Sequence, residues 1–259
     1  MRIPFCLWPY RRAGLWAALM LLWIPGAASA QMFTYGGDRS GPSQSLAVGY
    51  YLINFEFDGD EEPTPSFDFV DPAYGFVYSR PNFLVTFAFG NQGAGDGRDE
   101  LRLVDASFFV WGGFQLLRGD QERRVSLYIP ILLHSSYRRV SRDAPDDEFL
   151  DAFDFAVIGL GSGLGFRGGG KGWVVEARAT PILGLAVRSF GDTTGSARIL
   201  DTDVQIHFDS LFSQFGLTLG YGYRLQAWNI GASNLFPNIT NDLFDYSGNQ
   251  QLFRVGINW

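Results

Sequence analysis

Long stretches of this chain alternate strictly between apolar residues and small or polar residues, which leaves few folds open to it. The clearest stretch runs from Gln214 to Gln226, where alternate positions are all apolar or aromatic: Phe215, Leu217, Leu219, Tyr221, Tyr223 and Leu225. Successive side chains of a β-strand point to opposite faces, so a period of two predicts strands. We therefore expect an all-β protein.

Ten such stretches, separated by breaks rich in Gly, Asp, Asn or Pro, are the predicted strands. They cover residues 45–57, 73–79, 82–90, 101–117, 123–139, 152–167, 172–190, 197–210, 214–228 and 249–259. An even number of strands is typical of single-chain bacterial barrels. Eight or twelve strands are the alternative counts.

The breaks between the predicted strands alternate between long segments and tight turns. The long segments, acidic or rich in Asn, are 58–72, 91–100, 140–151 and 229–248, and the loop 191–196 is short for its side. This alternation is typical of an antiparallel, up-and-down transmembrane β-barrel, whose long loops lie outside the cell and whose turns lie in the periplasm.

A secreted β-sandwich would also alternate, and the polarity of its outer face separates the two folds. A sandwich surrounded by water carries many charges, whereas the non-apolar positions here are mostly Gly, Ala, Ser and Thr, and Lys171 is the single lysine of the chain. A narrow lumen lined by small residues fits this composition. We therefore predict one barrel domain over residues 45–259.

Residues 1–30 have the layout of a cleavable secretory signal peptide, with a basic start, an apolar middle and small residues at the end. Ala28 and Ala30 occupy the positions that signal peptidase recognises, so we expect cleavage after Ala30. Residues 31–44 would then form a short periplasmic lead-in. The only cysteine, Cys6, would leave with the signal peptide, which excludes disulfides and cysteine chemistry.

Composition excludes two further classes of protein. No uninterrupted apolar run reaches the roughly 18 residues that a membrane-spanning helix needs, so a helical membrane bundle is excluded. The formal net charge of −7 would repel nucleic acid, and we expect no such partner.

The chain ends in Trp259, and the alternate residues Phe253, Val255 and Ile257 share its face. This ending resembles the C-terminal sorting signal of Gram-negative outer-membrane β-barrel proteins. The resemblance implies an integral outer-membrane protein, surrounded by outer-membrane lipid and recognised by the barrel-assembly machinery during biogenesis. It also implies that the first and last strands pair to close the wall. It extends to the general class only and implies no substrate.

If the apolar rows face lipid, the intervening residues face a lumen, and several of them are charged. The predicted lumenal charge network consists of Glu176, Arg178, Arg188, Asp201, Asp203, Asp209, Arg224 and Arg254. A turn near 168–171 would set Gly163 opposite Glu176, and the next turn would set Asp203 opposite Gly220. Missing side chains on these glycines would leave room for the charged ones.

Two prolines interrupt the pattern, because Pro130 and Pro181 fall inside predicted strands. Each removes a hydrogen-bond donor from the ladder, so bulges or distorted wall positions are expected there.

The charge network fits two functions. It could fill a structural barrel, since a charge between low-dielectric walls must be paired or hydrated. It could also line a narrow, porin-like path whose charges set its selectivity for small solutes. We expect a protein of one of these two types and not an enzyme. A surface-binding adhesin acting through segments 58–72 and 229–248 is a further alternative.

A membrane-embedded hydrolase is the other alternative. His134, Ser136 and Glu148 resemble the His, Ser and Glu layout of the outer-membrane lipid A deacylases, in which a base activates a serine. His207, between two aspartates, would suit an omptin-like site. The acidic segments lack the spacing of a known calcium loop, so we expect no metal and no cofactor.

Overall fold

The computed structural model describes residues 44–59, 67–93, 100–118, 125–142, 152–188, 194–212, 214–231 and 243–259. The predicted signal peptide with Ala28 and Ala30, most of the predicted lead-in, and Glu148 lie outside these residues. No helix in the described ranges is long and apolar enough to cross a membrane.

The described residues form twelve β-strands. They are β1 (Ser45–Gly59), β2 (Phe67–Phe69), β3 (Pro72–Arg80), β4 (Phe83–Gln92), β5 (Leu101–Arg118), β6 (Val125–Arg142), β7 (Ala152–Ser162), β8 (Leu164–Gly170), β9 (Trp173–Arg188), β10 (Thr194–Phe212), β11 (Phe215–Gly231) and β12 (Leu243–Asn258).

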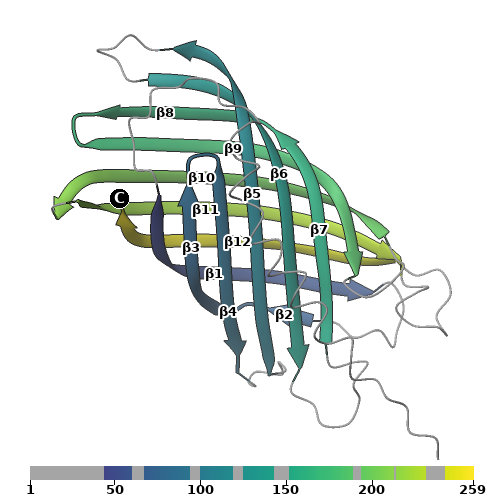
Figure 1. Ribbon diagram of the computed structural model, residues 1–259. Coiled ribbons are helices and arrows are strands. Elements are labelled where there is room, and N and C mark those ends of the chain that lie inside the picture. The colour runs from purple at the N-terminus through teal and green to yellow at the C-terminus, as the bar shows by residue number, and fades with distance from the viewer. Residues whose placement is uncertain are drawn as a thin grey trace, which may run out of the picture. The chain divides into compact units, whose positions relative to one another are not determined.

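Ten of these strands close into a barrel (Figure 1). The order around the wall is β1, β3, β4, β5, β6, β7, β9, β10, β11 and β12, and the first strand pairs with the last along its whole length. All of these pairs are antiparallel. The prediction of a ten-stranded, antiparallel, up-and-down barrel is therefore confirmed.

β7 and β8 lie along one line of the wall, and Pro130 and Pro181 on the neighbouring strands explain why that line is broken. The pairing of β6 with β7 stops at Ser162 and resumes with β8 in unchanged register, which puts Gly163 opposite Pro130. On the other side, the same register puts Ser162 opposite Pro181. A proline cannot donate to the ladder, so this strand loses its pairing on both sides at one place.

Strands also occupy parts of two predicted loops. β12 begins at Leu243, six positions before the predicted start, and β2 lies inside the segment 58–72. β2 extends the wall beside β1 beyond the point where β3 begins. Its other edge is covered by the buried amide of Gln92, which accepts from the Val70 N–H and donates to the Asp68 carbonyl.

The barrel has two different ends. We call the end where β3 meets β4, β8 meets β9 and β10 meets β11 the turn end, and the opposite end the loop end. Two turn-end connections contain a residue with a left-handed backbone, Asn82 (φ 69°) and Gly172 (φ 82°). Glycine and asparagine are the residues that adopt this conformation most readily in tight hairpins.

Large apolar side chains cover the outside of the barrel nearer the turn end, as predicted. Exposed fractions reach 70 % for Leu183, 65 % for Leu160 and 48 % for Ile257. We call this outward surface the apolar belt. Leu219 and Trp259 also point outward and belong to this belt.

The polarity of the wall reverses toward the loop end. On β1, Leu52 is exposed on the outside, but beyond it Ile53 and Phe55 are buried inside while Asn54 and Glu56 are exposed outside. On β10, Leu200 faces out, whereas Ile199 is buried and Arg198 is exposed. The loop end therefore has the inside-apolar pattern of a water-soluble protein, and the expectation of a lumen lined throughout by small and ionic residues was wrong there.

Candidate functional site

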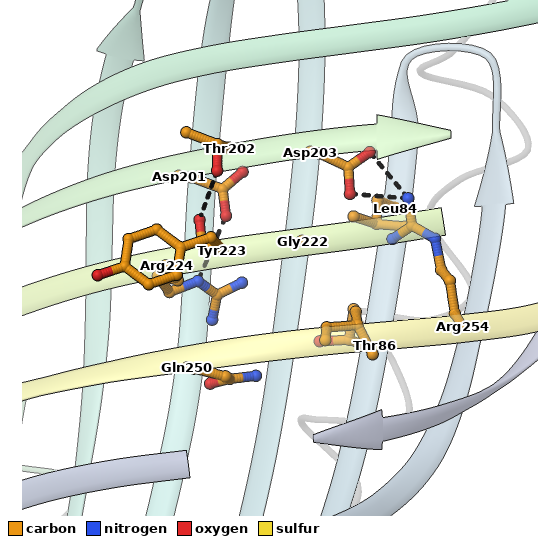
Figure 2. A pocket seen from close by; sticks show the side chains of 11 residues that line it. Leu84, Thr86, Asp201, Thr202, Asp203, Gly222, Tyr223, Arg224, Gln250 and Arg254 are labelled. Carbon is orange, nitrogen blue, oxygen red and sulfur yellow. Dashed lines mark hydrogen bonds and ion pairs between the residues drawn. The ribbon is translucent and has the colours of Figure 1, made fainter. Parts of the chain in front are cut away.

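Five residues of the predicted network converge inside the barrel from four neighbouring strands, β9 to β12. Asp201 accepts from Arg178 at 3.1 Å and from Arg224 at 3.4 Å. Asp203 accepts two hydrogen bonds from Arg254, at 2.9 and 2.7 Å (Figure 2). All five side chains are buried. The five residues thus form two adjacent ionic groups, Asp201 with Arg178 and Arg224, and Asp203 with Arg254, held by charge-assisted hydrogen bonds.

The registers that bring these groups together differ from those expected. Asp203 lies opposite Gly222 and Asp201 opposite Arg224, because the hairpin begins with the pair Phe212–Phe215, later in the chain than expected, and the two-residue shift at Phe208 makes up only part of that difference. The β8–β9 turn is made by two residues after Gly170, and it sets Arg167 opposite Glu176. The pairing of Gly163 with Glu176 and that of Asp203 with Gly220 were therefore wrong.

Glu176 forms a separate pair near the turn end. Its carboxylate lies 3.1 Å from the Arg167 guanidinium, and both side chains keep more than a quarter of their surface exposed. Asp209 lies farther along β10, and its amide donates to the Gly172 carbonyl at 2.9 Å. Arg188 ends β9 at the loop end, and its side chain lies outside the part of the chain that is described.

Arg138 forms a second buried centre that the sequence reasoning missed. It donates to Asp105 at 2.7 Å, to Gln250 at 2.8 Å and to the hydroxyl of Tyr246. Asp105 and Arg138 were overlooked because they share the inner face with apolar neighbours such as Leu103 and Val140. The available signal was that Arg138 lies in the polar alternate row of β6, which it shares with His134 and Ser136.

Several contacts cross the interior and join the β5–β6 wall to the opposite wall. Arg224 of β11 donates to the Ser107 hydroxyl of β5 at 2.9 Å. Its guanidinium also lies 4.9 Å from the ring centre of Phe109. Arg178 of β9 lies 4.2 Å from the ring centre of Trp111. These cation–π and hydrogen-bond contacts fill the middle of the barrel.

An aromatic cluster fills the interior at the loop end. Trp228 stacks on Tyr246 with ring centres 4.3 Å apart, and Phe155 meets Trp228 edge-on at 3.7 Å. Phe55 stacks between Phe69 and Tyr246 at 5.7 and 5.4 Å. All five rings are buried. These rings therefore pack the loop end of the described interior, next to Arg138.

Two small cavities lie beside these centres. One of about 20 Å³ lies beside Asp201, Asp203 and Arg254 (Figure 2). Another of about 20 Å³ lies beside Glu176 and His207. Each volume accommodates about one water molecule.

The two histidines occupy separate places in the interior. His134 Nε2 lies 3.0 Å from the Ser136 hydroxyl, within the distance that a general base requires. His134 is 0 % exposed, and its other ring nitrogen has no hydrogen-bond partner among the described residues. His207 bonds to the Thr218 hydroxyl at 2.9 Å. Within the described ranges, no group of three or more His, Cys, Asp or Glu residues could hold a metal ion.

The fold and its interior define the class of this protein. It is a closed, ten-stranded antiparallel β-barrel with an apolar outer belt and an interior packed with ion pairs and aromatic rings.

Comparison with protein families found no match, and comparison with curated proteins found none. Among solved structures, Neisserial surface protein A is similar at 12 % identity and a TM-score of 0.24, over 80 % of this chain and 96 % of that one. Ail, the attachment invasion locus protein of Yersinia pestis, is similar at 10 % identity and a TM-score of 0.21, over 83 % and 99 %. The P. putida toluene transporter TodX is similar at 7 % identity and a TM-score of 0.21, over 85 % and 93 %. Likeness at these values carries no inference about function.

Proposed function

We propose that this protein is an integral barrel of the bacterial outer membrane that acts as a closed scaffold and not as an open pore. The observation that carries the membrane location is the apolar belt, whose large side chains are exposed around the outside of a barrel with ionic groups within. Exposed apolar surface on this scale is stable in hydrocarbon and unfavourable in water. The signal-peptide layout of residues 1–30 supports the same location.

Aromatic residues at the turn end mark the boundary of the apolar belt expected in a bilayer. Trp259 and Phe215 are both exposed outward, and their rings meet edge-on at 6.4 Å. Tyr78 and Phe83 form a similar pair on β3 and β4 at 6.1 Å. Aromatic girdles of this kind flank the apolar band of outer-membrane barrels at the membrane surface. The short turns of outer-membrane barrels lie in the periplasm and the longer loops outside the cell, so we place the turn end in the periplasm and the loop end outside the cell.

The packed interior favours a scaffold over a porin-like path. Ions need a continuous hydrated route, and the aromatic cluster and the arginine bridges that occupy the described interior argue against one. We therefore expect purified protein in planar bilayers to give no conductance steps at any applied voltage. Successful insertion would be checked by the protease resistance of the strands. Steps that change in size on Arg224→Ala or Glu176→Ala would contradict the scaffold and support the pore.

The distance between His134 and Ser136 favours one second candidate, a hydrolase. A serine activated by a histidine reacts with fluorophosphonates, which label it covalently. We expect no labelling of Ser136, because the pair is enclosed by the wall and His134 is 0 % exposed. Labelling that is present in the parent protein and lost in Ser136→Ala would instead support the hydrolase, and His134→Ala should then lose it as well.

A further inference from the structure

A groove of about 560 Å³ runs across the apolar belt on the outside of β12, β1, β3 and β4. These strands are neighbours in the wall and include the seam between the first and last strands (Figure 1). Its main lining residues are apolar or aromatic: Val48, Tyr50, Tyr74, Phe76, Phe89 and Phe253. Two of these rings, Tyr50 and Tyr74, lie 5.4 Å apart. The volume of the groove lies within the range of about 300 to 1,000 Å³ found for small-ligand sites, which suits part of a lipid acyl chain.

Two arginines lie close to one side of this groove. Phe89 on β4 pairs with Val104 on β5, which in turn pairs with Arg139 on β6. Arg102 is the next outward residue beyond Val104 toward the loop end and lies opposite Asn91. Arg102 and Arg139 are both exposed and are diagonal neighbours on one face. Cβ atoms in such pairs are about 7 to 8 Å apart, so both guanidinium groups can reach one anion.

The arginines lie at the loop-end boundary of the apolar belt. On β6 the outward residues change from Leu133 through Tyr137 to Arg139, and on β5 they change from Val110 to Arg102. Strands of a barrel tilt against its axis, so the row from Phe253 to Arg139 leaves the belt as it crosses the wall. In a bilayer, the Phe253 end of this row would lie in hydrocarbon and the Arg139 end at the headgroups.

We propose that the groove and the arginine pair bind one membrane lipid, with an acyl chain in the groove and a phosphate of the headgroup on Arg102 and Arg139. Guanidinium groups suit this anion because they form two parallel hydrogen bonds to phosphate oxygens. Charged neighbours among the described residues include Asp154, opposite Arg139 on β7, and Glu100, just before β5, and Arg102 already makes a contact of its own. Asp154 competes with the phosphate for Arg139. The proposal rests on the membrane location proposed above.

Native mass spectrometry of detergent-solubilised protein tests this proposal with two added lipids, dipalmitoyl phosphatidate and dipalmitoylglycerol, which differ only in the phosphate. We expect the parent protein to retain one phosphatidate at least tenfold more tightly than dipalmitoylglycerol. The variant Arg102→Gln/Arg139→Gln should lose this preference, whereas Arg198→Gln, an exposed outward arginine on β10, should keep it. Asp154→Asn should tighten phosphatidate binding about two- to fivefold, because it removes the competing carboxylate.

The acyl-chain half of the proposal has its own variant. Val48→Trp fills the groove and should lower retention of both lipids at least fivefold. The matched control is Leu183→Trp, which adds the same side chain to an outward position on β9 and should change neither.

Three results would overturn the lipid site. These are equal retention of the two lipids by the parent protein, unchanged preference in the double arginine variant, and unchanged retention in Val48→Trp. Each would leave the membrane location standing if the protein still inserts into phosphatidylcholine vesicles. Failure to insert into such vesicles would instead contradict the proposed function itself.

Discussion

Arg138→Ala is expected to lower the free energy of unfolding by about 3 to 5 kcal/mol, because it leaves the buried carboxylate of Asp105 without its cation. Arg138 is 2 % exposed and is the shared donor for groups on β5 and β12, which lie on different parts of the wall. Removing it also leaves Gln250 and the Tyr246 hydroxyl without this donor. The measurement is the urea midpoint of the barrel in lipid vesicles, followed by the gel shift between folded and unfolded forms.

Two companion variants identify the cause of that loss. Arg198→Ala changes an exposed outward arginine on β10 and should stay within about 0.5 kcal/mol of the parent protein. Arg138→Met combined with Asp105→Leu removes both charges and should recover most of the loss, since apolar residues often replace a buried ion pair without penalty. A double variant as unstable as Arg138→Ala would show that the hydrogen bonds to β12, and not the unpaired carboxylate, carry the effect.

Leu160→Arg is expected to destabilise the barrel in a bilayer by about 2 to 4 kcal/mol, the penalty for arginine facing hydrocarbon near the membrane midplane. Leu160 is 65 % exposed and lies in the apolar belt between Leu133 and Leu183 on the neighbouring strands. In a water-soluble protein, a charge at such an exposed position would change stability by about 0.5 kcal/mol or less. Urea unfolding in vesicles of known bilayer thickness measures the difference in unfolding free energy between Leu160→Arg and the parent protein.

Asn54→Arg is the matched control, because Asn54 also faces outward but lies on β1 beyond the reversal of polarity. We expect it to change stability by less than about 0.5 kcal/mol, since its side chain remains in water. Equal effects of the two substitutions would contradict the membrane boundary placed between Leu52 and Asn54. Negligible effects of both would contradict the membrane location of the belt.

Strand positions could be predicted well because alternation is a property of adjacent residues. The prediction for 101–117 differs from β5 by one residue, and that for 214–228 lies within three residues of β11. The break at Gly163 could not be read in this way, because its cause lies in Pro130 and Pro181 on the two neighbouring strands. The early start of β12 was missed because Asn-rich composition was taken as loop, whereas pairing with β1 and β11 keeps the segment extended.

The interior was predicted less completely than the wall. Arg178, Asp201, Asp203, Arg224 and Arg254 were selected because a charge on the inner face must find a partner, and they do meet. Their pairing required the register, which a shift of two positions near Phe208 and Phe212 changes throughout the hairpin. Arg138 was missed because its partners, Asp105 and Gln250, are far away in the chain, although its own row on β6 also carries His134 and Ser136.

The sequence by itself determined that this chain forms long amphipathic strands in even number, because the alternation of side chains needs no knowledge of distant residues. Only the tertiary structure decided which face is apolar at each end of the wall, which arginine meets which aspartate, and that rings pack the loop end of the interior. Those features depend on strand register and on contacts across the lumen, where residues more than a hundred positions apart, such as Arg138 and Tyr246, come into contact.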